Sequence, residues 1–389
     1  MFELVEVVEK TESSTVIKVI GVGGAGGNAV EHMIREGVQG VEFICVNTDS
    51  QALGRSCADI KLQLGPGLGA GGKPEKARDL AQTERERIAG MLRGAHMVFI
   101  TAGMGGGTGT GAAPIVAEVA RELGILTVAV VTKPFEYEGR RMSLAEQGIV
   151  ELGMNVDSLI VILNEKLMEV LGDEISMLDA FRAADNVLKN AVGGIAEIIN
   201  VPGLVNVDFE DVRTVMGEMG KAMMGSATAS GVDRARIAAE RAVASPWLEG
   251  IELSGAKGVL VNITASQSLG LREVKEVMNT IRTYAAPDAA TFFGAVCEEG
   301  MGDELRVTVV ATGLGSVAKR QSKPEISVVP TLRTGTDNIA YDALPAQELD
   351  GLPPVFQTGR AARNAAVDDL RSSGVEKYDI PAFLRRQAD

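Results

Sequence analysis

The residues of this chain best suited to chemistry lie in two glycine-rich stretches, because glycine lets backbone N–H groups approach anionic oxygens closely. The first covers residues 21–28 (GVGGAGGN) and the second residues 103–111 (GMGGGTGTG). Each follows an apolar run and precedes a helical pattern, and the N-terminus of a helix can hold a phosphate. Thr108 and Thr110 add hydroxyls that suit phosphate oxygens or a Mg²⁺ shell. We therefore predict that the chain binds the phosphates of a nucleotide.

The first stretch alone leaves two interpretations open. It contains the pattern GxGxxG, which is also typical of dinucleotide-binding domains, where Asn47 or Asp49 after the next strand could bind a ribose. That interpretation leads to an NAD-dependent oxidoreductase. The second stretch favours a triphosphate, because a dinucleotide-binding domain needs no second phosphate cradle. The sequence GxxxxGK followed by Ser or Thr does not occur, so the chain is not a P-loop protein.

The elements that must position these stretches alternate between strands and helices. Residues 16–22, 41–49, 96–103 and 125–134 are rich in β-branched and other apolar residues and predict buried strands. Helical patterns cover residues 28–37, 76–92 and 112–124. This alternation predicts an α/β fold with a parallel sheet that is covered by helices on both faces.

A wide apolar stripe that includes Phe181, Leu188 and Val192 predicts one long helix over residues 173–199. At about seven turns, this helix is long enough to lie between two domains and pack against both. After it come a polar, Gly-rich region to about residue 235 and a smaller α/β domain. That domain is predicted to contain helices at 235–245 and 271–285 and strands at 258–265, 290–299 and 304–314.

The expected domains are therefore residues 1–172 for nucleotide binding, the central helix at 173–199 and a second domain at 200–316. Residues 317–374 are rich in proline and contain two aromatic residues, Tyr341 and Phe356, which predicts a flexible linker. The chain ends in KYDIPAFLRRQAD, where an apolar cluster precedes two arginines. We expect residues 375–389 to dock on another protein, although a tail with stray apolar residues has the same composition.

Composition excludes several classes of function. The formal net charge of −14 disfavours a nucleic-acid partner, because such binding depends on Lys and Arg at phosphates. The first residues of the sequence show neither the basic start nor the apolar core of a signal peptide, and no apolar run is long enough for direct membrane insertion. We therefore expect a soluble, cytoplasmic protein. The three cysteines and the two histidines, His32 and His96, lack the spacing of a metal site or a nucleophile, so we expect no protein metal site.

Further residues could do chemistry but have ordinary structural interpretations when taken alone. Asp208 is a good helix N-cap and Asp211 an acidic residue of the first turn. Phe181 would be a core residue of the long helix, and Asp185 a solvated one.

Several motifs in their order along the chain resemble the tubulin/FtsZ superfamily of GTPases, and in particular its bacterial FtsZ branch. They are GVGGAGGNAVEHMI, NTDSQAL, TAGMGGGTGTGAAP, KPFEYEGRRM, NVDFEDVRTVM and DIPAFLRR, which together span most of the length. The resemblance implies a tubulin-like fold that binds GTP or GDP with Mg²⁺ and hydrolyses GTP when it polymerises. It also implies a cell-division protein that polymerises head to tail into filaments of the mid-cell division ring. Membrane tethers and regulators would bind its C-terminal peptide.

The same resemblance places the nucleotide on both glycine-rich stretches and on later segments. These residues are Gly24, Ala25, Gly26, Gly27, Asn28, Gly105, Gly106, Gly107, Thr108, Gly109, Thr110, Glu138, Arg141, Asn164, Phe181 and Asp185. A carboxylate can accept both the N1–H and the exocyclic amine of guanine, which adenine cannot offer, and Phe181 offers a flat stacking face. Arg140 is the alternative to Arg141, because EGRRM has one basic residue fewer than is usual in the family.

Hydrolysis is assigned by the resemblance to Asn206, Asp208 and Asp211 of the next subunit. The carboxylates of Asp208 and Asp211 would orient the attacking water at the γ-phosphate and help to hold the cation. A scaffold that binds nucleotide without turnover is the remaining alternative, and the presence of both aspartates disfavours it.

Overall fold

The computed structural model of the chain describes residues 15–166, 172, 176–201, 203–218, 220–244, 256–287 and 289–314. All of them fall within one unit, Met1–Arg320. The expected linker at 317–374 and the expected docking peptide at 375–389 lie outside the described residues.

A ten-stranded sheet with the order β3-β2-β1-β4-β5-β6-β7-β10-β8-β9 runs through this unit. Its first part is parallel, as the alternation of strands and helices predicted. The four strands expected there are present as β1, β2, β4 and β5, and two further strands join them. In sheet order they are β3 (Ile60–Gln63), β2 (Val41–Asn47), β1 (Ile17–Val22), β4 (Met97–Gly103), β5 (Leu126–Lys133) and β6 (Ser158–Leu163).

The strand order reverses between β1 and β4. From β1 the chain moves outward to β2 and β3 and then returns to add β4 on the other side of β1. The carboxyl ends of β1 and β4 therefore meet where the order reverses, which is where open α/β sheets bind their ligands. Both glycine-rich stretches lie at these two ends.

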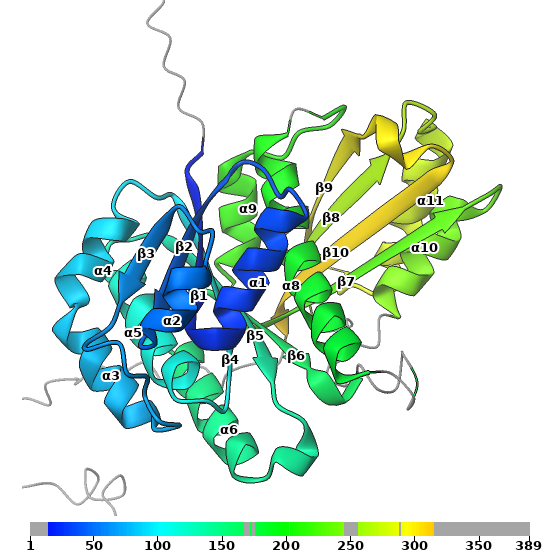
Figure 1. Cartoon of the computed structure of the whole chain (residues 1–389). Helices are drawn as coiled ribbons and strands as arrows, with labels where there is room; N and C mark the ends of the chain where they lie inside the picture. The colour runs from blue at the N-terminus through cyan, green and yellow to red at the C-terminus, as the bar shows by residue number, and fades with distance from the viewer. Residues whose placement is uncertain are drawn as a thin grey trace, which may run out of the picture. The chain divides into compact units, whose positions relative to one another are not determined.

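Helices cover both faces of the parallel part (Figure 1). One face packs against α1 (Gly23–Arg35), α8 (Met177–Asn200) and α9 (Phe209–Met216). The other packs against α3 (Pro74–Thr83), α4 (Arg85–Leu92), α5 (Thr108–Glu122) and α6 (Arg140–Gly153). Short α2 (Ser50–Arg55) follows β2, and single 3₁₀ turns occupy Glu136–Glu138 (η1) and Glu299–Met301 (η3).

The single helix predicted over residues 76–92 is wrong, because the structure has two helices that meet at Glu84. The Thr83 hydroxyl donates to the Asp79 carbonyl oxygen at 3.0 Å. Such a bond to the preceding turn bends a helix, and residues on both pieces pack into the same core cluster. The apolar period does not reveal this break, since Ala81 before it and Ile88 after it are both buried.

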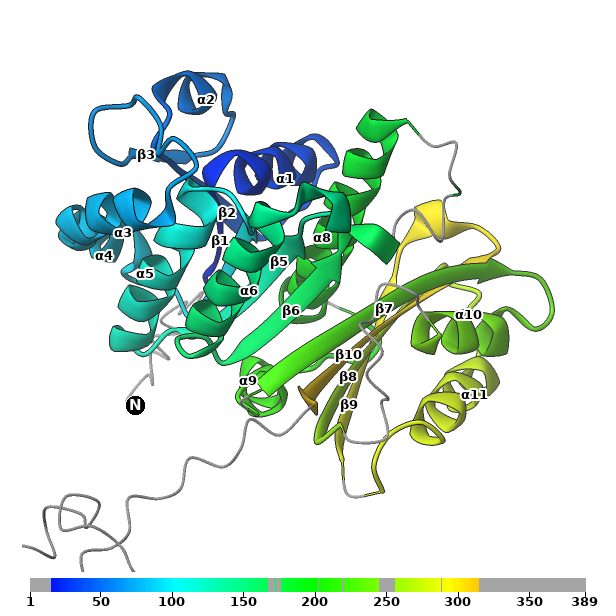
Figure 2. The same ribbon diagram turned by 90° about the horizontal axis from the view of Figure 1, so that it is seen from below.

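The second part of the sheet continues from the first through β7 (Gly220–Ser230), which pairs in parallel with β6 (Figure 2). Beyond β7 the strands are β10 (Glu304–Leu314), β8 (Gly258–Ala265) and β9 (Ala290–Cys297), with β10 antiparallel to both of its neighbours. Sequence reasoning assigned the β7 residues to a polar, Gly-rich region, which is wrong. Small residues such as Ala and Ser have weak strand preference alone, and here pairing on both sides makes them a strand.

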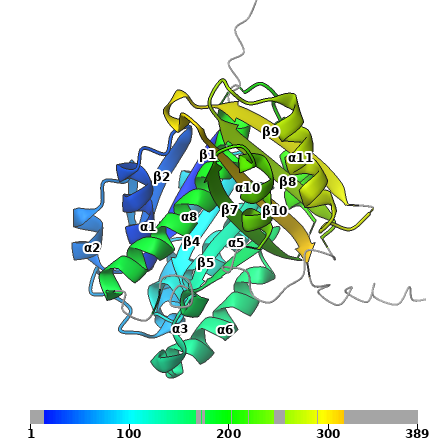
Figure 3. The same ribbon diagram turned by 90° about the vertical axis from the view of Figure 1, so that its right-hand side faces the viewer.

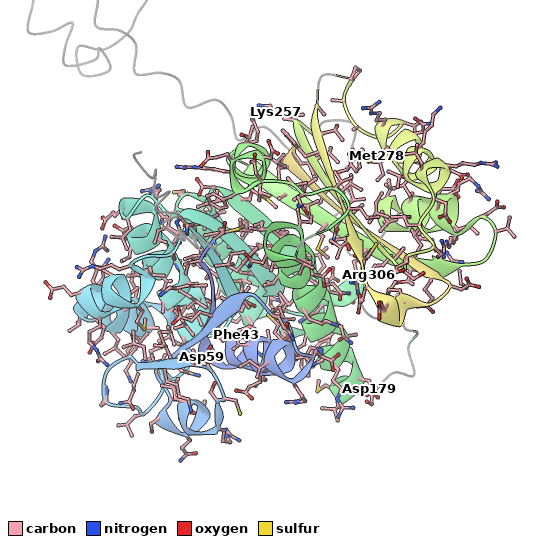
Figure 4. All side chains as sticks on the ribbon, turned by 90° about the horizontal axis from the view of Figure 1, so that it is seen from above. Phe43, Asp59, Asp179, Lys257, Met278 and Arg306 are labelled. Carbon is pink, nitrogen blue, oxygen red and sulfur yellow. The ribbon has the colours of Figure 1, made fainter. Side chains whose placement is uncertain are left out.

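The long helix α8 packs against both parts of the sheet, as its length predicted. Leu188 and Val192 of α8 share one core cluster with Val130 of β5 and with Leu260 and Val310 of the second part. Near the end of α8, Glu197 forms an ion pair with Arg306 of β10 at 3.2 Å, and Arg306 lies beside this helix in Figure 4.

The opposite face of the second part is covered by α10 (Arg234–Val243) and α11 (Leu271–Arg282), which lie side by side in Figure 3. Arg234 joins them. Its guanidinium is 2.6 Å from Glu273 of α11 and also donates to the Asp303 carbonyl oxygen and the Ser268 hydroxyl. The Arg234 side chain is only 8% exposed, so this buried cation depends on its partners.

Candidate nucleotide-binding and hydrolysis site

The first glycine-rich stretch forms the start of α1 without an intervening loop. The helix begins at Gly23, and not near Asn28 as the sequence pattern indicated. A Cβ on Gly21 would lie 2.4 Å from the Gly26 carbonyl oxygen, and a Cβ on Gly26 would lie 2.3 Å from the Thr101 carbonyl oxygen of β4. Strand and helix pack so closely that these two positions exclude any side chain. The N-terminal N–H groups of α1 consequently lie at the carboxyl edge of the sheet.

The second stretch connects β4 to α5 and packs against the first. A Cβ on Gly103 would come within 2.6 Å of the Ala25 side chain, and one on Gly23 within 2.9 Å of the Gly109 nitrogen. Helix α5 begins at Thr108, so a second helix N-terminus lies beside that of α1. Two helix N-termini at one point produce a site for an anion with several negative charges.

A third glycine-rich segment, residues 65–72, contributes to the same place and was missed by the sequence reasoning. A Cβ on Gly107 would lie 2.9 Å from the Ala70 side chain and 3.0 Å from the Lys73 nitrogen. The sequence GPGLGAGG offered a compositional signal for this loop. It follows a strand of only four residues, however, and the helical pattern after it starts too late to suggest a phosphate site.

Among the described glycines of the two stretches, Gly24 and Gly106 have the most open surroundings. A Cβ on Gly24 would meet nothing within 4 Å, and one on Gly106 would meet only the Arg141 guanidinium at 4.0 Å. The neighbouring Gly26 and Gly107 have no such space. The open space above Gly24 and Gly106 therefore marks the side from which a ligand can reach the backbone.

The two threonines of the second stretch have different surroundings. The Thr108 hydroxyl is 2.6 Å from the Thr48 hydroxyl and is partly exposed. The Thr110 hydroxyl is buried and accepts a hydrogen bond from the Gly105 N–H at 2.9 Å. Thr110 therefore shapes the loop from within, whereas Thr108 is placed to meet a ligand.

Glu138 and Arg141 lie at the edge of the site, after β5. The Glu138 carboxylate accepts from the Phe135 N–H at 3.1 Å and pairs with the Arg141 guanidinium. Because Arg141 is also the nearest group to Gly106, it lies beside the second stretch. This placement favours Arg141 over Arg140, which the sequence had left as the alternative.

Asn164 has an unpaired polar atom of the kind that a ligand would satisfy. It follows β6 at the same edge of the sheet and is 7% exposed. Its side-chain oxygen is buried and has no hydrogen-bond partner among the described residues. Buried polar atoms are rarely left unpaired, so a donor from outside the described residues is expected here.

Phe181 and Asp185 differ from their ordinary interpretations. Phe181 is 45% exposed in the first turns of α8, where its ring meets Phe135 edge to face at 6.4 Å. It is therefore an exposed aromatic surface and not a core residue. Asp185 is half-buried, and burial raises the pKa of its carboxyl to about 6 against the opposing effects of His32 and Arg35 of α1. It is not a solvated helix residue.

The residues predicted to act in hydrolysis lie near the amino ends of the parallel strands, opposite the glycine-rich stretches. Asp208 is the N-cap of α9, as expected, and accepts from the Asp211 N–H at 2.8 Å. Asn206 accepts from the Gly203 N–H at 2.7 Å and so shapes the loop before the helix. The ring of Phe209 lies 6.0 Å from that of His96, which directly precedes β4.

Since the second glycine-rich stretch follows the carboxyl end of β4, the acidic residues and this stretch lie at opposite ends of one strand. A seven-residue strand is roughly 20 Å long. Figure 1 shows the same separation, with α9 at the upper end of the sheet and α3 and α6 at the lower end. The two groups do not meet within one chain.

Comparison with known proteins settles the family. The profile of the Tubulin/FtsZ family GTPase domain matches residues 16–172, and that of the FtsZ family C-terminal domain matches residues 220–315. Cell division protein FtsZ of Coxiella burnetii is 54% identical over 365 residues, which cover 92% of this chain and 93% of that protein. The Pseudomonas aeruginosa protein of the same name is 54% identical over 383 residues, with 93% and 94% covered. The chain belongs to the FtsZ family.

Solved structures agree with this assignment. An empty FtsZ dimer of M. jannaschii superposes with a TM-score of 0.74 at 41% identity, covering 78% of this chain and 89% of that one. The resemblance found in the sequence is thus confirmed, as is the tubulin-like α/β fold. The protein is a cell-division GTPase that binds guanine nucleotide, and the dehydrogenase interpretation of GxGxxG is not favoured. Among the described helices, none is long and apolar enough to cross a membrane.

Proposed function

We propose that GTP binds at the carboxyl edge of the sheet and is hydrolysed when a second subunit adds its acidic loop, residues 205–211. Turnover would therefore require head-to-tail assembly. The nucleotide would contact residues 24–28 and 105–110 together with Glu138, Arg141, Asn164, Phe181 and Asp185. The reacting groups of the neighbour would be Asn206, Asp208 and Asp211. Residues 1–172 would thus bind the nucleotide, the helix at 173–199 would connect the halves, and residues 200–316 would supply the loop.

One observation supports this proposal above the others, namely the placement of the two groups at opposite ends of β4. A loop at one end and a nucleotide at the other can meet only between two molecules. The contact is heterologous, because different surfaces of the two subunits touch, and it propagates as a filament when it does not close into a ring. The M. jannaschii relative was solved as an FtsZ dimer, which supports self-association.

The groups at the nucleotide edge suit guanine. The ionised Asp185 carboxylate would accept from N1–H and the exocyclic amine, the Phe181 ring would stack on the base, and the unpaired Asn164 oxygen would accept from the nucleoside. The helix N-termini at Gly23 and Thr108 would bind phosphate oxygens. Phosphoryl transfer depends chiefly on positioning and charge stabilisation, which these groups can supply.

We include Mg²⁺ in the proposal, because nucleoside triphosphates react as complexes in which the cation neutralises phosphate charge. The Thr108 hydroxyl fits such an ion, whereas the Thr110 hydroxyl is already bonded to the Gly105 N–H. The described residues contain no group of three or more His, Cys, Asp or Glu placed to bind a metal. Phosphate oxygens and water molecules would then supply most of its ligands.

A mixing experiment tests whether the site is shared. Asp211→Ala should bind GTP and assemble but hydrolyse at least roughly a hundredfold more slowly, since removal of one positioned catalytic group typically has this effect. Wild-type protein is then held below the concentration at which it turns over alone, and an excess of Asp211→Ala is added. Phosphate release per wild-type subunit should rise, because each wild-type loop now meets the nucleotide of a variant subunit.

Glu210→Ala is the matched control, because Glu210 is an exposed acid of the same turn whose carboxylate pairs with Arg213. It should leave turnover unchanged. If Asp211→Ala in excess leaves the wild-type rate unaltered while the two proteins sediment together, the shared site is wrong. Turnover per subunit that is independent of protein concentration would lead to the same conclusion.

The family also supports a proposal for the place and partners of this protein. We place it in a cytoplasmic filament at the mid-cell division ring, since its relatives are named cell division proteins. Membrane tethers and regulators would bind residues 375–389, and the linker at 317–374 would give this peptide its reach.

A further inference from the structure

His96 is a side chain that the reaction does not use, yet it lies behind the acidic loop. It occupies the turn before β4, at the amino end of the parallel strands. The imidazole Nδ1 accepts a hydrogen bond from the Val16 backbone N–H at 3.0 Å, and the backbone N–H of His96 donates to the Val16 carbonyl oxygen at 2.9 Å. The side chain and backbone of His96 are thus both tied to the residue before β1, which fixes the position of the imidazole.

The imidazole meets the ring of Phe209 edge to face, with 6.0 Å between centroids and 67° between planes. Phe209 is the first residue of α9 and directly follows the N-cap Asp208, so a shift of its ring would move both acidic side chains of that turn. Phe209 is half-buried against the core, and His96 contacts it from the exposed side. The contact links β4, which ends at the phosphate loop, to the start of α9.

The acidic loop has a second attachment to a different part of the fold. Val205 forms an isolated antiparallel bridge with Ala295 of β9, in which the Ala295 N–H donates to the Val205 carbonyl oxygen at 3.0 Å. One end of the loop is therefore held by the second part of the sheet and the other by His96 of the first. Among the described ring contacts, that between His96 and Phe209 is the one that ties this loop to the nucleotide-binding part.

We propose that His96 is a positioning residue for hydrolysis, which acts through Phe209 to orient Asp208 and Asp211 toward the nucleotide of the neighbouring subunit. The proposal rests on the shared site described above. An edge-to-face pair contributes enough to alter a rate by about threefold to tenfold, and a small misplacement of reacting groups has effects of at least this size. The effect should act only in trans, on the nucleotide held by the next molecule.

The test uses each variant as the donor of the loop. A low, fixed concentration of full-length donor is mixed with increasing Asp211→Ala, and phosphate release is measured up to saturation. His96→Ala should lower the plateau rate by about threefold to tenfold and leave the half-saturating concentration unchanged. His96→Phe keeps a ring against Phe209 without the acceptor nitrogen, and should recover most of the wild-type plateau.

Two further measurements distinguish a misfolded variant from a wrong positioning role for His96. The GTP affinity of His96→Ala should equal that of wild type, which shows that its own site is folded, and Arg93→Ala, an exposed residue of the same turn, should behave as wild type. An equal plateau for His96→Ala and wild type overturns the positioning role. A shift in half-saturating concentration alone, or a His96→Phe plateau as low as that of His96→Ala, also overturns it. If the wild-type donor itself gives no release, the shared site has failed, and not His96.

Discussion

At the residue scale, neighbouring glycines of one motif have different reasons to be glycine. Gly107 is surrounded by Ala70 and Lys73, so its missing side chain is needed for the packing of two loops. Gly106 has open space, so its missing side chain leaves room for something outside the described residues. The sequence does not distinguish these two glycines, and only the atoms that surround them in the folded protein do.

This difference predicts opposite outcomes for two adjacent substitutions. Gly106→Ala should keep the melting temperature of wild type and weaken GTP binding by roughly tenfold, since an added methyl group meets the ligand. Gly107→Ala should lower the free energy of unfolding by about 1–3 kcal/mol, because its Cβ would clash in the free protein. Thermal unfolding and GTP titration distinguish the two. Equal effects of both variants on stability would contradict this assignment.

The Asp185 carboxyl leads to a prediction about pH. Its pKa of about 6 lies above the ordinary aspartate value of 3.8 because of burial, so the folded protein takes up this proton at a higher pH than the unfolded chain does. Donors from guanine require the ionised form. GTP affinity should therefore be full near pH 7 and fall by about tenfold per unit below pH 6.

Asp185→Asn serves as the control for this titration. It should lose about tenfold to a hundredfold in GTP affinity at pH 7, because hydrogen bonds to a charged group are lost. The remaining GTP affinity of Asp185→Asn should not show the decrease below pH 6 that protonation of Asp185 causes in wild type. Protonation of the GTP phosphates changes the affinity of both proteins equally. The free variant should be at least as stable as wild type at pH 7, since the buried charge is removed. A parallel decline in both proteins would exclude Asp185 as the titrating group.

At the element scale, the covering helices of the second part depend on one buried cation. Arg234→Ala would leave the Glu273 carboxylate without its partner and remove bonds to Asp303 and Ser268. Loss of one member of a buried ion pair typically lowers the free energy of unfolding by about 3–5 kcal/mol, and the 22% exposure of Glu273 places this pair at the lower end. Urea unfolding of the nucleotide-free protein measures the effect.

A matched variant lies on the same helix. Arg236 pairs with Glu240 at 3.0 Å, but both side chains are 45% exposed. Arg236→Ala should therefore change the free energy of unfolding by less than about 1 kcal/mol. If the two arginine variants were equally stable, the joining of α10 and α11 would not depend on Arg234.

At the scale of the whole molecule, we predict that the catalytic and docking roles separate along the chain. Deletion of residues 375–389 should leave GTP hydrolysis within about twofold of wild type, because a terminal segment beyond a linker is not expected to contribute to the packed site. The same deletion should abolish binding of membrane tethers, measured by co-sedimentation with tether-bearing vesicles. Unchanged tether binding after deletion would place the docking site elsewhere.

Much of this molecule follows from local sequence patterns. The strands β1, β2, β4, β5, β8, β9 and β10 are readable because each is rich in β-branched and other apolar residues, and α8 because its apolar stripe persists over many turns. The glycine-rich stretches indicated a phosphate site by themselves, since few other functions need glycine between a strand and a helix. The N-cap role of Asp208 was equally readable from residue type.

Other features were decided by tertiary contacts that no local pattern encodes. Strand β7 exists because β6 and β10 supply hydrogen-bond partners to a sequence with weak strand preference. Residues 65–72 belong to the site because they pack against Gly107 of the second glycine-rich stretch. The raised pKa of Asp185 arises from burial between two helices. The sequence by itself determined that a phosphate site and an acidic turn are present. That they lie at opposite ends of one strand was decided only by the fold, because the order of strands sets which residues share an edge.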